Sequence, residues 1–190
     1  MQTFTLVFLA ALLLTALTQV WLAARHIRHI RAHQNKVPDD FARQIGLADH
    51  RKAADYTCAK TRAGYPGILL HTVLLLIFTL GGGLSALSNF WAGWLSDPLA
   101  HGIALIIGTF FIMGIAEIPL SYYRTFVIEA QYGFNKMTRG MFFTDLIKQS
   151  VLGLLLGAPL LFCFLWLMEK MGENWWLYAW FAWIAFNLFV

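Results

Sequence analysis

Long apolar runs constrain this chain more than any other feature of its sequence. Five of them can be read, over residues 3–24, 66–87, 99–123, 150–168 and 175–190. A helix needs about 20 apolar residues to cross the roughly 30 Å hydrocarbon core of a bilayer. Lipid offers no partner for backbone polar groups, so a spanning segment must satisfy them within its own helix. The runs therefore predict an all-α, polytopic membrane protein with about five transmembrane helices.

The composition also favours a membrane protein. Charged residues make up 13% of the 190 residues and hydrophobic residues 59%, whereas a soluble domain carries about 25% charged residues. The first run could instead be a cleaved signal peptide, because Ala23 and Ala24 follow its apolar core. Against this reading, no basic residue precedes that core, and the core is longer than is usual for a signal peptide.

Basic residues are distributed unevenly between the connections. Residues 25–65 carry nine Lys or Arg and residues 124–149 carry four, whereas residues 88–98 carry none and residues 169–174 only Lys170. Basic residues near the ends of spans stay in the cytoplasm. We therefore expect an outside N-terminus and two cytoplasmic segments, 25–65 and 124–149, that contain short helices. The short outer connections indicate a bacterial inner membrane. The expected partner of these residues is the lipid bilayer and not a nucleic acid, because they flank membrane spans.

Glu117 is the most informative polar residue within the predicted spans. An ionisable group in a span is costly and usually faces the bundle interior, a water-filled cavity or a partner. Alternatively, Glu117 lies near enough to the cytoplasmic end of its span to reach head-group water. Pro119 should weaken the helix beside it. His71 is interpreted as an interface residue, and the glycine run 81–83 as a close helix approach or a bend.

Three histidines share one helical face in the first cytoplasmic segment. His26, His29 and His33 recur at i, i+3 and i+7, a spacing that could bring three metal ligands together. Three arginines interleave with them and oppose a further cation. A basic helix that rests among lipid head groups explains the pattern without a metal. A second helix is expected over residues 49–62.

A more specific pattern follows the third span. Residues 119–138 read PLSYYRTFVIEAQYGFNKMT. Together with the span pattern and the earlier segment KVPDDFARQIGLADHRKAADY, this stretch resembles the type-1 CAAX prenyl protease family of integral-membrane zinc metalloproteases. The GFNKMT run is the most specific element of a resemblance that covers nearly the whole chain.

The resemblance implies an N-terminal membrane region that houses and positions a zinc-protease section, which is expected after residue 190. Family members build their zinc site on H-E-x-x-H, in which two histidines bind zinc and the glutamate activates water. None of the six histidines of this chain is followed by Glu. We therefore expect no catalytic and no metal-binding residue here, and no activity from the chain alone. Zinc and a peptide or protein substrate would belong to the full-length enzyme.

The motif supplies candidates for contact with that catalytic section, namely Glu129, Gly133, Phe134, Asn135, Lys136, Met137 and Thr138. Alternatively, these residues only cap and close the loop around Gly133. A second hypothesis is a non-enzymatic polytopic membrane protein that serves as a binding, assembly or transport-complex subunit. In that case Glu117 and Pro119 would mark a pathway through the membrane.

Overall fold

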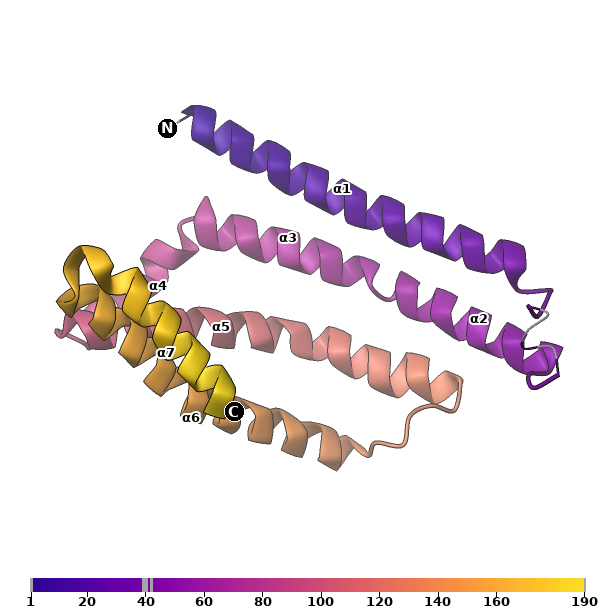
Figure 1. Cartoon of the computed structure of the whole chain (residues 1–190). Helices are drawn as coiled ribbons and strands as arrows, with labels where there is room; N and C mark the ends of the chain where they lie inside the picture. The colour runs from indigo at the N-terminus through magenta and orange to yellow at the C-terminus, as the bar shows by residue number, and fades with distance from the viewer. Residues whose placement is uncertain (1, 39–40, 42, 190) are drawn as a thin grey trace. The chain divides into compact units, whose positions relative to one another are not determined.

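The computed structural model describes residues 2–38, 41 and 43–189, which form helices joined by short connections (Figure 1). Strands are absent from this described part of the chain. The elements are α1 (Gln2–His33), α2 (Leu47–Arg62), α3 (Tyr65–Thr79), α4 (Gly83–Ala92), α5 (Pro98–Tyr123), the π-helix η1 (Arg124–Glu129), α6 (Arg139–Lys170), the short 3-10 helix η2 (Gly172–Asn174) and α7 (Trp175–Phe189). The predicted all-α class is confirmed, and the expected helix over residues 49–62 is α2.

Four helical stretches of the described chain are long and apolar enough to cross a membrane. They are Gln2–His33, Leu47–Thr79, Pro98–Glu129 and Arg139–Lys170. The fifth predicted run corresponds to α7, which has 15 residues and is therefore about 22 Å long at 1.5 Å per residue. Val190, the predicted end of that run, lies outside the described residues.

The chain divides into two compact units. The first comprises Met1–Ile77 and Ile115–Met137, and the second Phe78–Gly114 and Thr138–Val190. Within the first unit α1 packs against α2, and α2 packs against η1; within the second unit α6 packs against α7.

Each unit buries few side chains. The buried apolar residues are Ile27, Ala54, Cys58 and Ile128 in the first unit, and Phe78, Phe142 and Leu167 in the second. Large apolar side chains along the predicted spans stay exposed, as at Leu14 (67%) and Phe110 (69%). Apolar patches of this extent mark surfaces that contact a membrane or another protein, which is consistent with helices that face lipid.

The glycine run interrupts the second predicted span. The apolar run 66–87 does not form one helix, because α3 ends at Thr79 and α4 begins at Gly83. Gly82 has φ +75°, a left-handed conformation that glycine adopts without the steric penalty of a Cβ. A Cβ placed on Gly82 would meet nothing within 4 Å. Gly82 therefore makes a bend and is not itself a point of close helix approach.

Candidate functional site

The GFNKMT segment begins with a helix cap. Gly133 follows η1 with φ +78°, and its N–H donates to the Ala130 carbonyl at 3.1 Å. The N–H groups of Phe134 and Asn135 both donate to the Glu129 carbonyl, at 2.9 and 3.2 Å. A left-handed glycine with such bonds satisfies carbonyls that the end of a helix leaves without donors. The cap turns the chain away from the helix axis immediately after Glu129.

Two polar side chains of the motif bind the backbone ahead of α6. Asn135 Oδ1 accepts a hydrogen bond from the Met137 N–H at 2.7 Å, which shapes a turn. Thr138 is the N-cap of α6, and its Oγ1 accepts from the Met141 N–H at 3.2 Å. These bonds give Asn135 and Thr138 a local capping role. Contact between the motif and a catalytic section stays a prediction.

Aromatic and basic side chains hold the start of the motif against α2. The Tyr56 ring lies 4.6 Å from the Phe134 ring and 5.5 Å from the Tyr132 ring, centroid to centroid. Lys52 Nζ lies 5.7 Å from the Phe134 centroid, and Lys60 Nζ lies 5.7 Å from the Tyr56 centroid. Tilted aromatic pairs and ammonium groups over ring faces are both attractive. We call these five residues the aromatic–lysine cluster.

The motif still offers side chains to its surroundings. Phe134 is 51% exposed although one side of its ring meets Tyr56. Lys136 is exposed, whereas Glu129, Asn135 and Met137 are half-buried. Within η1, Ile128 is buried at 8% exposure. The segment thus has a fixed base on α2 and an outward surface made by Phe134 and Lys136.

The helix that leads into the motif changes its geometry near its end. α5 runs continuously through Pro119 to Tyr123, so the expected weakening at Pro119 does not break the helix. The chain then passes into η1, and π-helical turns occur frequently at functional sites. At the start of η1, Arg124 approaches α3 so closely that a Cβ on Gly67 would lie 2.9 Å from its Nη2 atom. Gly67 is therefore the residue that admits the guanidinium.

Glu117 has a partner within the first unit. Its Oε1 atom is in hydrogen-bond contact with Nε2 of His71, which joins α5 to α3. The two side chains are 52% and 54% exposed. Pairing with a second polar group lowers the cost of placing an ionisable residue in a span. Glu117 precedes Glu129 by twelve residues, about 18 Å along a helix, so the pair is separate from the motif.

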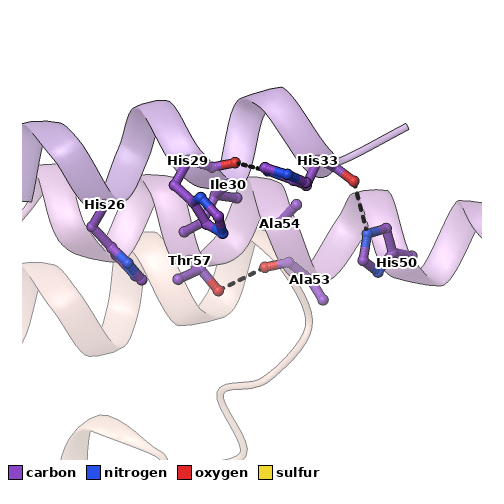
Figure 2. Close-up of a pocket in the computed structure, with 8 residues that line it drawn as sticks. All are labelled: His26, His29, Ile30, His33, His50, Ala53, Ala54 and Thr57. Carbon is purple, nitrogen blue, oxygen red and sulfur yellow. Dashed lines mark hydrogen bonds between the residues drawn. The ribbon is translucent and has the colours of Figure 1, made fainter. Parts of the chain in front are cut away.

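The histidines of α1 meet a fourth histidine from α2. His26, His29 and His33 line a groove together with His50, as Figure 2 shows. Nowhere in residues 2–38, 41 and 43–189 do three or more His, Cys, Asp or Glu side chains form a group that could hold a metal ion. The described residues therefore offer no ligand set for the zinc, which the resemblance implies for a section after residue 190.

The search of the sequence for motifs missed two features of the first unit. Lys52, Tyr56 and Lys60 recur at i, i+4 and i+8, which places them on one face of α2, and this spacing is the signal that could have revealed them. His71 and Glu117 were considered separately, and the structure brings them together.

Comparisons with known proteins agree with this architecture. Residues 26–190 match the family described as CAAX prenyl protease N-terminal, five membrane helices. A CAAX prenyl protease 1 homolog of Caenorhabditis elegans is 32% identical over 155 residues, which is 80% of this chain and 34% of the relative. A CAAX prenyl protease 1 homolog of Homo sapiens is 28% identical over 184 residues, which is 92% of this chain and 38% of the relative.

A solved structure shares the fold. The crystal structure of S. mikatae Ste24p matches with a TM-score of 0.85 and 20% identity, and the match covers 95% of this chain and 43% of that one. This chain spans about a third of the length of the curated relatives that it matches. The five membrane helices of the family and the apolar helices described above make the protein a multi-pass integral membrane protein. The chain belongs to the CAAX prenyl protease N-terminal family.

Proposed function

We propose that this chain is the membrane region that houses and positions the zinc-protease section of an integral-membrane metalloendopeptidase. The observation that carries the proposal is the state of the GFNKMT segment. Its backbone is capped, and one side of the Phe134 ring fixes its start on α2. The rest of Phe134 and the side chain of Lys136 remain exposed. A surface ordered before binding loses little conformational freedom when a partner docks. The motif suits a preformed contact with the section that follows residue 190.

The charge distribution supports an orientation for this contact. The basic residues of segments 25–65 and 124–149 favour the cytoplasmic side for both. The motif and the aromatic–lysine cluster then face the cytoplasm, and the chain returns to that side after its fifth span. The N-terminus lies outside. The short outer connections favour a bacterial inner membrane as the host.

The substrate class follows from the relatives. Their names describe them as CAAX prenyl proteases, which supports a prenylated peptide or protein as the substrate of the whole enzyme. Zinc would be bound by the catalytic section, since the part of this chain that the structure describes offers no ligand set for it. We therefore expect the isolated 190-residue chain to bind no stoichiometric zinc and to cleave no peptide.

The first experiment is the intact mass and the zinc content of the protein purified from its native membrane. We expect a mass well above the 21.6 kDa of this chain and one zinc ion per protein, together with peptidase activity. A mass of 21.6 kDa without zinc or activity would contradict the proposal. That result would favour a non-enzymatic binding, assembly or transport-complex subunit.

A charge reversal at Lys136 tests the docking role of the motif. Lys136 is exposed, so Lys136→Glu should leave the folding of the chain unchanged. In the native protein we expect cleavage of a prenylated peptide to fall about tenfold. If Lys136 docks against the catalytic section, Glu at this position replaces a charge that attracts the partner surface by one that this surface repels. Lys36→Glu is the matched control, since Lys36 is also exposed on the predicted cytoplasmic side. Equal activity of the two variants would contradict the docking role.

A further inference from the structure

Four of the six histidines gather at one place outside the motif. His26, His29 and His33 from α1 and His50 from α2 line a groove of about 340 Å³ within the first unit. The remaining lining residues are Ile30, Ala53, Ala54 and Thr57 (Figure 2). One water occupies about 30 Å³ in the liquid, so the groove has room for a group larger than several waters. We call it the histidine groove.

The rings that line the groove offer hydrogen-bond donors. His33 Nδ1 lies 2.8 Å from the His29 carbonyl oxygen, and His50 Nε2 lies 3.3 Å from the His33 carbonyl oxygen. The ring nitrogens of His26 and His29 form no hydrogen bond with any residue that the structure describes, and Figure 2 shows both rings at the groove. A histidine ring carries at least one N–H in either tautomer. His26 and His29 therefore hold unused donors at the groove.

The surroundings of the groove are basic. Arg25, Arg28 and Arg31 interleave with the histidines along α1, and the described lining includes no Asp or Glu. Positive charge of this density opposes a metal cation and attracts an anion. Within the residues that the structure describes, no metal-holding group forms here. The ligand that fits ring N–H donors and this charge is an anion with several acceptor oxygens, as in a phosphate group.

The position of the groove relative to the bilayer indicates the source of the anion. The apolar part of α1, residues 3–24, is about 33 Å long at 1.5 Å per residue and fills the hydrocarbon core of about 30 Å. His26 and His29 then lie about 3 and about 7.5 Å beyond that core, within a head-group layer that is about 5–7.5 Å thick on each side. Arg25 stands over the Trp21 ring, 5.5 Å from its centroid, and Trp is typical of this interface.

We propose that the histidine groove binds the phosphate of an anionic phospholipid head group. The N–H donors of His26 and His29 would hold the phosphate oxygens, α2 would close the groove through His50 and Ala53, and the arginines would supply the long-range attraction. The proposal is independent of the zinc-protease section, because every residue that it uses belongs to α1 and α2.

Native mass spectrometry of the purified 190-residue chain tests the proposal. The chain is held in a neutral detergent and titrated with phosphatidylglycerol, with phosphatidylcholine, and with inorganic phosphate. We expect one phosphatidylglycerol to be retained per chain. The double variant His26→Ala/His29→Ala should weaken this retention at least about tenfold, because it removes two hydrogen bonds to a charged group. Phosphatidylcholine should be retained more weakly because its head group carries no net charge.

Two further variants keep the test decisive. Ala53→Phe fills the groove from α2 without altering a histidine, and we expect it to weaken retention as well, so that a folding defect of the double variant does not decide the result. Arg43→Gln removes a charge away from the groove lining and should change retention little. Undiminished retention in both groove variants would overturn the proposal, as would an equal loss in Arg43→Gln. Displacement of the lipid by equimolar inorganic phosphate would assign the groove to a soluble anion and also overturn it.

Discussion

Replacing Gly133 by alanine tests whether the motif is fixed by its backbone. Gly133 has φ +78°, a region in which a Cβ costs about 1–2 kcal/mol. The new methyl group meets little else, because the nearest atom is Lys52 Nζ at 4.0 Å, at the end of a flexible side chain. Gly133→Ala should therefore favour release of the motif from α2 by about 1–2 kcal/mol. That free energy corresponds to a roughly 5- to 30-fold larger released population.

Residue 128 gives a direct assay for this release. Ile128 lies in η1, the element that packs against α2, and is only 8% exposed. In an Ile128→Cys background with Cys58→Ser and Cys163→Ser, the rate at which a maleimide labels residue 128 follows the population of locally open states. We expect Gly133→Ala to raise this rate about 5- to 30-fold. Gly133→Asn should raise it less, because asparagine tolerates the left-handed conformation better than alanine does.

Gly140 supplies the matched control. It lies in the first turn of α6, and a Cβ there would meet only Thr138 Oγ1, at 4.0 Å. Alanine suits a helical conformation, so Gly140→Ala should leave the labelling rate of residue 128 unchanged. An unchanged rate in Gly133→Ala would refute the reasoning, and so would an equal rise in Gly140→Ala.

Two other predictions concern the contact at η1 and the orientation of the chain. A Cβ on Gly67 would lie 2.9 Å from Arg124 Nη2. Gly67→Ala should therefore lower the stability of the unchanged chain more than it lowers the stability of an Arg124→Ala variant. We expect a coupling energy of at least about 0.5 kcal/mol from thermal unfolding of the four proteins in detergent, and strict additivity would exclude the contact. A topology reporter fused at Lys136 should report the cytoplasm and one at Asn89 the outside; the reverse pattern would contradict the orientation.

Local chemistry explains which parts of the fold could be predicted from the sequence. The apolar runs identify helices because spanning backbone must bond within its own helix. The glycine run 81–83 indicates a close helix approach or a bend, and Gly82 makes the bend because glycine adopts the left-handed conformation without penalty. Gly133, Asn135 and Thr138 likewise have roles set by neighbours a few residues away. In each case the residue and its effect lie within one short window of sequence.

The docking of the motif on α2 depends on residues far apart in the chain. The spacing of Lys52, Tyr56 and Lys60 reveals one face of α2, but it does not reveal what covers that face. Phe134 and Tyr132 reach it only because η1 packs against the same helix. The partner is therefore set by packing between elements, which no local pattern encodes.

The pairing of His71 with Glu117 shows the same limit inside the membrane. The two residues are 46 positions apart, and their helices are apolar nearly all round, so no hydrophobic face fixes the rotation of either helix. Each residue of slippage turns a helix by about 100° and shifts it by about 1.5 Å, which would carry His71 away from Glu117. Contact with lipid does not favour one rotation of α3 or α5 over another. An unpaired ionisable group in a span, by contrast, is costly. The pair can therefore set both the rotation and the register of α3 against α5 within the first unit, a choice that the apolar surfaces of these helices leave open.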